Sequence, residues 1–217
     1  MTRRRDPVRL WMIGALGGAL ALAAEILADR GTGLDGIGQA VRYTARWSFV
    51  FFWLSYVGGA LATLFGSAFA GLARAARPLG LAFAAALQVH IGLVVWMGVV
   101  IGQIPLSGGL LWFFVAALSS TYLLALLSFG VGTRTLGRLW RPVLFVATTY
   151  ILIAFGWDFV QGALDRSARS WRHAAEYLPF ALMCLVAIPL RLAAHLRVRL
   201  RSATPSTNLD REPATCP

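Results

Sequence analysis

Long apolar runs alternate with short polar connections along the whole chain. Each run is close to the twenty or so residues that carry a helix across the ~30 Å hydrocarbon layer of a bilayer. Six spans are predicted, at Leu10–Ala28, Trp47–Ala70, Leu79–Ile101, Gly109–Gly130, Pro142–Val160 and Ala174–Ala194. Because most connections are short, neighbouring helices should pack antiparallel. The pattern therefore predicts an all-α integral membrane bundle of six transmembrane helices.

Two segments depart from this pattern. The stretch Asp158–Arg172, "DFVQGALDRSARSWR", mixes arginine, aspartate and tryptophan, which suits a helix lying on the membrane surface. The final stretch, residues 201–217, is polar and contains three prolines, so it is predicted to be a disordered cytoplasmic tail. Residues 1–200 are then a single six-helix transmembrane domain.

Composition supports the membrane class and changes how the charge is interpreted. Hydrophobic residues make up 58% of the 217 positions and charged residues only 13%. The net charge of +11 comes from arginines placed between apolar runs, which indicates membrane orientation and no nucleic-acid partner. Of these twenty arginines, fourteen lie on the side that holds the N-terminus. By the positive-inside rule, both termini are expected in the cytoplasm. The six on the other side are Arg30, Arg42, Arg46, Arg166, Arg169 and Arg172.

Few polar side chains fall inside the predicted spans, and His90 is the most informative of them. An ionisable group in hydrocarbon is costly and normally faces the bundle interior. His90 lies near the middle of the third span, where three roles stay open. It is a haem ligand, a proton relay with Glu25 as its neighbour, or a packing residue bonded to another helix. His173 and His195 are expected at the two surfaces.

No motif of a soluble enzyme accompanies these spans. The chain contains no phosphate-binding loop, dinucleotide fingerprint or nucleophile elbow. Its two cysteines, Cys184 and Cys216, have no metal-site spacing. No flavin or nicotinamide domain is attached, so redox chemistry would need an external electron donor. The glycine pairs Gly14/Gly18 and Gly98/Gly102 predict close approach of helices.

Four stretches of the sequence resemble the ferric-reductase-like transmembrane family. They are "YTARWSFVFFWLSYVGGAL" from Tyr43, "RPLGLAFAAALQVHIGLVVW" from Arg77, "LGRLWRPVLFVATTYILIAFGW" from Leu136 and the closing "HAAEYLPFALMCLVAIPLRL". Within the family they are most similar to the haem-binding membrane subunits of bacterial periplasmic methionine sulfoxide reductase systems. The resemblance implies a bacterial inner-membrane protein that carries electrons through b-type haem. It also implies that His90 occupies the position of the helix-three ligand.

The chain departs from that family at the other haem ligands. The two helix-five histidines of the family fall near Leu144 and Trp157, and residues 142–160 contain no histidine. A second ligand on the third helix would fall at Gln103 or Ile104. Iron could then be held by His90 alone, or by His90 with a water or with one of two methionines. These methionines are Met97 and Met183.

The missing histidines leave three functional hypotheses. The first is an electron-transfer oxidoreductase subunit with a reduced haem ligand set at His90, working with a redox partner. The second is a haem-free structural or accessory subunit of a larger membrane complex. The third is a small transporter, suggested by Glu25, Gln88 and His90.

Overall fold

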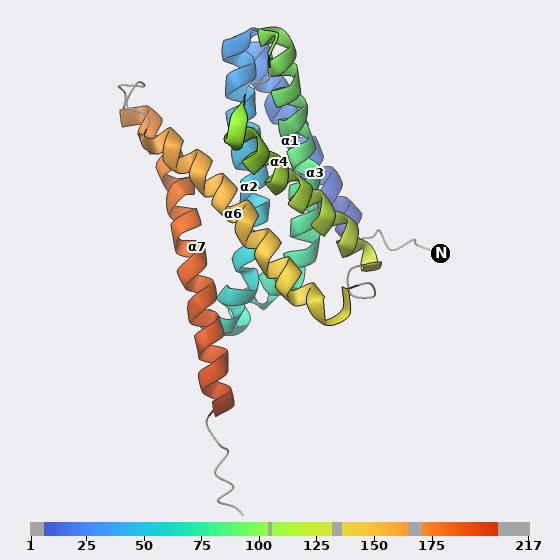
Figure 1. The fold of residues 1–217 in the computed structure, drawn as a ribbon, viewed down its shortest axis with the longest axis vertical. Helices are drawn as coiled ribbons and strands as arrows, with labels where there is room; N and C mark the ends of the chain where they lie inside the picture. Colours follow the sequence, from blue (N-terminus) through green and yellow to red (C-terminus); the bar gives the residue numbers. More distant parts are fainter. Residues whose placement is uncertain (1–6, 104–105, 132–135, 165–170, 204–217) are drawn as a thin grey trace, which may run out of the picture.

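The computed structural model describes residues 7–103, 106–131, 136–164 and 171–203, which form helices joined by short turns and contain no strand. The fold class is therefore all-α, as predicted (Figure 1). The long helices are α1 (Pro7–Arg30), α2 (Leu34–Phe65), α3 (Ala70–Ile101), α4 (Gly108–Leu126), α6 (Trp140–Leu164) and α7 (Trp171–Ala203). Shorter turns are η1 (Gly66–Phe69) between α2 and α3, the π-helical turn η2 (Leu127–Val131) after α4, and η3 (Gly137–Leu139) before α6.

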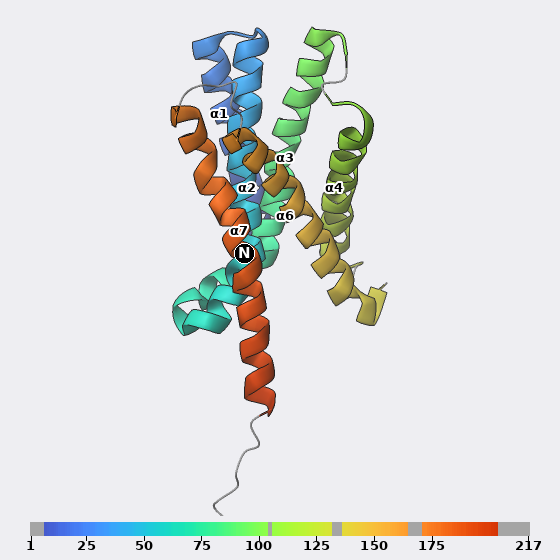
Figure 2. The same cartoon turned by 60° about the vertical axis from the view of Figure 1, so that its left-hand side comes forward.

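Five helical stretches in the described residues are long and apolar enough to cross a membrane. This marks the chain as a multi-pass membrane protein, although the number differs from the six predicted spans. The difference arises at Leu34–Ile101, a continuous helical stretch of 68 residues that joins α2, η1 and α3. Within it, α2 and α3 lie side by side and run in opposite directions, with η1 at the lower end of the view (Figure 2).

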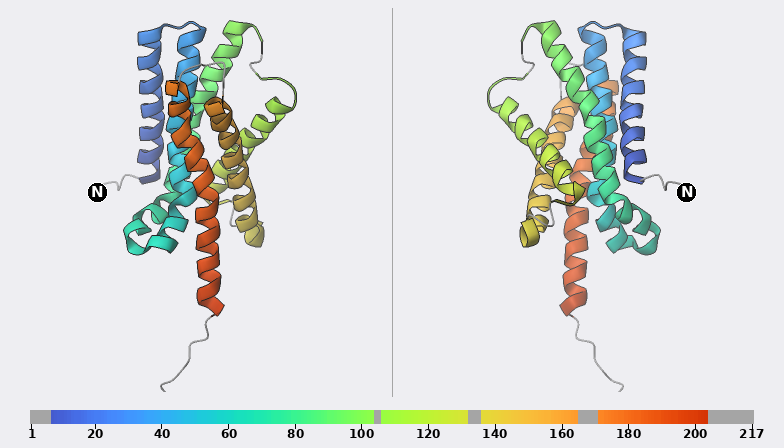
Figure 3. Two further views of the ribbon diagram at one scale, coloured as in Figure 1. Left: turned by 90° about the vertical axis from the view of Figure 1, so that its left-hand side faces the viewer. Right: turned by 90° about the vertical axis from the view of Figure 1, so that its right-hand side faces the viewer.

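Helix α2 is the centre of the bundle. It contacts α1, α3, α6 and α7, while α4 packs chiefly on α6. As a result, α1 and α4 lie at opposite edges of the molecule (Figure 3). The upper end in Figure 1 carries the α1–α2 turn and the end of α3, and the lower end carries η1 and the start of α6.

An aromatic cluster joins α2 to α3, α6 and α7. Phe49 is fully buried, and its ring centroid lies 4.9 Å from that of Phe159. The Phe52 ring packs in a tilted arrangement on Phe83 of α3, with the ring centroids 5.1 Å apart. Helices in lipid gain no hydrophobic driving force from packing together, so such dispersion and ring contacts hold them. Each aromatic pair contributes about 0.5–1.5 kcal/mol beyond its buried area.

Small residues bring α1 close to its neighbours. Ala15 and Ala19 of α1 pack against Ala82 and Ala86 of α3 in one buried cluster. At Gly18, an added Cβ would lie 2.6 Å from Cζ2 of Trp47 on α2, so only glycine fits there.

The close approach predicted for the two glycine pairs is confirmed at Gly18, whereas Gly102 has another role. Gly18 does allow close approach, but a Cβ on Gly14 would meet nothing within 4 Å. Gly102 ends α3 in a left-handed conformation at φ 75°, and its N–H donates to the carbonyl of Gly98. Glycine is favoured there because a side chain would be strained at positive φ.

Hydrogen bonds from side chains cross between helices at several depths. Trp47 Nε1 donates to the carbonyl of Ala15 at 2.9 Å. Trp53 Nε1 donates to the carbonyl of Met183 at 2.8 Å. Such bonds satisfy polar atoms that hydrocarbon cannot solvate. Further examples are Ser55 Oγ to Ala76 O, Tyr122 Oη to Gln88 Oε1, and Tyr150 Oη to Phe113 O.

The connection predicted as a surface helix is organised differently. Asp158–Leu164 continues α6 without a break, and α7 begins at Trp171. The prediction of a surface helix is therefore wrong for Asp158–Leu164. This part still packs on the bundle through the buried Phe159. Of the predicted tail, residues 201–203 belong to α7, and residues 204–217 lie outside the described residues.

Replacing Gly18 by leucine should destabilise the bundle. The new side chain would displace the Trp47 indole and break its bond to Ala15, at a cost of about 1–3 kcal/mol. Thermal unfolding in detergent would measure this loss. Gly17→Leu is the matched control, because a Cβ at Gly17 meets nothing within 4 Å. Equal melting temperatures for the two variants would contradict the packing described.

Candidate functional site

His90 lines a partly open cavity of about 540 Å³ between α2, α3, α4 and α6, with Tyr177 of α7 also on its wall. We call this space the His90 cavity. Its volume falls within the range of sites that bind cofactors and small ligands. The walls are largely apolar, and the polar side chains on them are few. These are Arg42, His90, Thr121, Asp158 and Tyr177.

The ring of His90 is oriented by α2. Its Nδ1 lies 3.0 Å from the backbone carbonyl oxygen of Val41. A carbonyl can only accept, so Nδ1 must carry the hydrogen and donate it. In the neutral ring the lone pair is then on Nε2. This is the arrangement found in metal-bound histidines, whose second ring nitrogen donates to a carbonyl or carboxylate.

The interhelical bond also bears on the packing role considered for His90. A histidine bonded to a carbonyl on another helix is the arrangement expected of a packing residue. The same bond would also orient a metal-binding histidine, so it does not distinguish the packing role from the ligand role. The proton-relay role has less support, because Glu25 is exposed on α1 and does not line the His90 cavity.

The cavity offers one nitrogen ligand and no opposing one. Met97 lines the same cavity but is seven residues further along α3. Residues seven apart leave the same face of a helix, so His90 and Met97 cannot lie on opposite faces of one planar macrocycle. The residues present therefore fit a haem with a single axial ligand from the protein, and they do not fit a haem held by two histidines.

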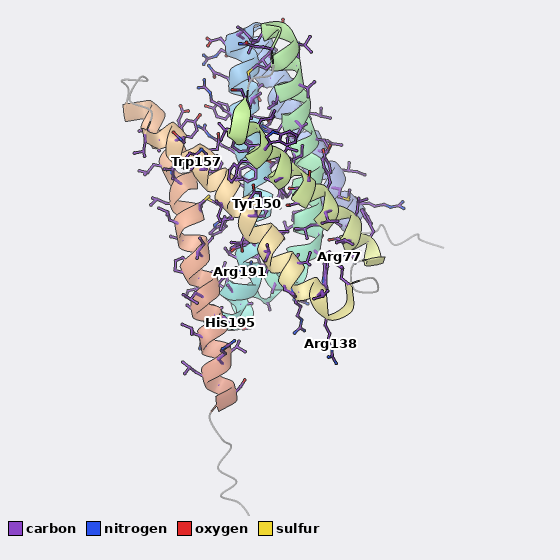
Figure 4. The ribbon with its side chains drawn as sticks, viewed as in Figure 1. Arg77, Arg138, Tyr150, Trp157, Arg191 and His195 are labelled. Carbon is purple, nitrogen blue, oxygen red and sulfur yellow. The ribbon has the colours of Figure 1, made fainter. Side chains whose placement is uncertain are left out.

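The other positions considered for a second ligand lie elsewhere. Leu144 is on α6 but lines a different cavity, described below. Trp157 is 51% exposed on the outside of α6 (Figure 4). Met183 packs against the aromatic cluster and does not line the His90 cavity. Gln103 follows the end of α3, and Ile104 lies outside the described residues.

The two other histidines both belong to α7. His195 is exposed near the lower end of α7 (Figure 4). His173 falls in the first turn of α7 instead of the predicted loop. In the described residues, no group of three or more histidine, cysteine, aspartate or glutamate side chains is placed to hold a metal ion.

Arg46 is a residue whose role the sequence pattern did not indicate. The sequence pattern placed Arg46 in a connection between two spans. In the structure it is the thirteenth residue of α2, and it is only 6% exposed. Its Nη1 lies 3.4 Å from Oε2 of Glu176, and its guanidinium stacks 4.5 Å from the ring centroid of Tyr177. Among the described residues, its Nε and Nη2 have no hydrogen-bond partner. Arg46 thus ties α2 to α7 beside Tyr177, a residue of the cavity wall.

An exposed ion pair lies at the end of α1. Arg30 Nε pairs with Oδ2 of Asp29 at 3.0 Å. Both members of this pair are largely exposed, so it contributes little to stability.

In comparisons with known proteins, no family model, curated protein or solved structure matches this chain. The ferric-reductase-like resemblance therefore stays a prediction from the motifs quoted above.

Glu176→Gln should destabilise the bundle by leaving the buried Arg46 guanidinium without its counter-charge. Because the Glu176 side chain is about half exposed, we expect a loss of about 1–2 kcal/mol, less than for a fully buried pair. Thermal unfolding in detergent measures it, with Glu25→Gln on α1 as the control. A double variant, Arg46→Met with Glu176→Gln, should recover stability, because it removes both charges. A Glu176→Gln protein as stable as the control would contradict the role of this pair.

Proposed function

We propose that this protein is a ferric-reductase-like membrane subunit that binds one b-type haem through His90. The observation that carries the proposal is the orientation of the His90 ring. Nδ1 of His90 donates to the Val41 carbonyl, which leaves the lone pair of the neutral ring on Nε2. The His90 side chain lines a cavity of about 540 Å³. The oriented ring and the space beside it are together what support a ligand role.

A haem in this position would supply one-electron transfer. The chain's own residues would bind and orient it. His90 would provide the nitrogen ligand, and the hydrogen bond to the Val41 carbonyl orients its ring. Arg42, on the same cavity wall, would provide a cation for a carboxylate of the cofactor. With one protein ligand, the iron would keep an open coordination position. An electron donor and an acceptor would both be external partners.

A haem-free structural or accessory subunit is the second candidate. It is favoured by Leu144 and Trp157, which occupy the helix-five ligand positions of the resembled family with side chains that cannot bind iron. In that case the His90–Val41 bond would only join α2 to α3.

The proposed topology has six crossings. The stretch Leu34–Ile101 contains two antiparallel helices of 32 residues each, and each is long enough to span a bilayer. We infer that α2 and α3 cross separately, with η1 between them in the cytoplasm. Both termini are then cytoplasmic, in agreement with the arginine distribution, and the membrane is the bacterial inner membrane.

Removing the imidazole should abolish haem binding, and free imidazole should restore it. We expect a Soret band for the full chain expressed with adequate haem supply, loss of the band in His90→Gly, and its recovery when imidazole is added. His195→Ala is the control and should keep the band, because His195 is exposed far from the cavity. The spectrum of a single-histidine site should also respond to carbon monoxide, since one coordination position is open.

A full-length protein without a Soret band would overturn the haem proposal and favour the accessory subunit. A band that persists unchanged in His90→Gly would show that another residue holds the iron.

Cysteine accessibility should place the two turns of the α1–α3 region on opposite sides of the membrane. In a background of Cys184→Ala and Cys216→Ser, a membrane-impermeant maleimide should label Thr32→Cys in intact spheroplasts. It should label Ser67→Cys only in inverted vesicles. Both positions are exposed, so the reagent can reach them. Labelling of both from one side would contradict two crossings by α2 and α3.

A further inference from the structure

A second cavity, also of about 540 Å³, lies at the lower end of the bundle and is lined by three arginines. We call it the arginine cavity. Arg74 and Arg77 come from α3 and Arg191 from α7, and Figure 4 places Arg77 and Arg191 at the same end of the bundle. Of the described residues that line it, none is an aspartate or glutamate.

These arginines have no carboxylate partner in the part of the chain that the structure describes. The ion pairs there use Arg30 and Arg46 instead. Arg74 Nε donates to the carbonyl of Ala70 on its own helix at 3.3 Å. Three neighbouring cations at one cavity repel one another, and an anion bound among them would relieve that repulsion.

Arg191 is the most informative of the three because it lies within a predicted span and is partly buried. Its guanidinium stacks 4.3 Å from the ring centroid of Tyr56 and 5.2 Å from that of Phe145. Its Nη1 lies 3.4 Å from Oγ1 of Thr148, a long hydrogen bond. An arginine inside a membrane-spanning helix normally marks a binding site or pathway. Here the side chain is held at the cavity by aromatic rings, with most of its donors available.

The rest of the cavity is apolar. Leu81 and Phe83 of α3 line it together with Leu124 of α4 and Ile151 of α6. Hydroxyls from Ser55, Ser128 and Thr148 add hydrogen-bonding groups to the wall. A small soluble anion would use only the charged part. An amphiphile with an anionic head and hydrocarbon chains would use both parts.

We propose that the arginine cavity binds an anionic phospholipid, with its phosphodiester among Arg74, Arg77 and Arg191 and its acyl chain against the apolar wall. Guanidinium groups suit phosphate oxygens because they offer planar, paired donors. Basic pockets between transmembrane helices bind anionic headgroups in this way. The site is independent of haem binding, since its residues, apart from Thr121 and Ile151, are separate from those of the His90 cavity.

Lipid binding to the purified full-length chain tests the proposal. After delipidation in a neutral detergent, short-chain phosphatidylglycerol should bind at about a tenfold lower concentration than short-chain phosphatidylcholine, measured by native mass spectrometry and thermal shift. Arg77→Gln and Arg191→Gln should each weaken phosphatidylglycerol binding about fivefold. Neither should change phosphatidylcholine binding.

Arg199→Gln is the matched control for charge. It removes the same charge from α7 at the same end of the bundle, but Arg199 is exposed and does not line the cavity. Arg77→Gln keeps the test valid if Arg191→Gln fails to fold, because the exposed Arg77 makes no ion pair that its loss would break.

Three results would overturn the proposal. Equal binding of the two lipids would show that the charge is not recognised. Equal weakening by Arg199→Gln would indicate a diffuse surface effect. Stabilisation by glycerol phosphate equal to that by phosphatidylglycerol would show a site for a soluble phosphate and no use of the apolar wall.

Discussion

The close packing of α2 against α3 is the contact on which the rest of the molecule depends. A Cβ at Gly58 of α2 would lie 3.0 Å from Cγ of Leu72, and Ser55 Oγ donates to the carbonyl of Ala76 at 2.7 Å. Further up the same pair, the Val41 carbonyl meets His90. In lipid, where apolar surface gives no association free energy, small residues and interhelical hydrogen bonds of this kind hold helices together. The pair forms the wall on which α1, α6 and α7 are arranged.

The ionisable groups inside the bundle have partners on other helices, whereas the buried hydroxyls of Thr44, Ser48 and Thr121 donate to carbonyls of their own helices. Arg46 finds Glu176 and Tyr177 on α7. Arg191 finds the Tyr56 ring and a weak bond to Thr148. His90 finds a backbone carbonyl. Arg46 and Arg191 use aromatic rings because cation–π contacts stabilise a cation without adding a second buried charge. These contacts connect helices that are far apart in the sequence.

The two cavities differ in the polar groups that they offer. The His90 cavity holds one oriented imidazole, with Arg42 and Asp158 also on its largely apolar wall, and we propose that it takes a planar cofactor. The arginine cavity holds three cations and no acid, which suits an anionic amphiphile. Thr121 and Ile151 line both, so the two sites share part of the wall formed by α4 and α6. The two cavities otherwise use different residues, so a ligand in one does not require a ligand in the other.

The sequence by itself determined the helical membrane class, because long apolar runs have few alternatives in a bilayer. It also singled out His90, since an ionisable residue inside such a run is rare enough to notice. The sequence predicted helix boundaries less well. Helix α2 begins 13 residues before the predicted start at Trp47, because hydropathy alone does not show that Arg46 is buried by its ring contacts and its ion pair. Only the tertiary structure decided which helix orients His90, that Gly18 makes room for Trp47, and that arginines from α3 and α7 meet at one cavity. These are contacts between residues distant in the chain, and a local pattern of hydrophobicity and charge carries no information about them.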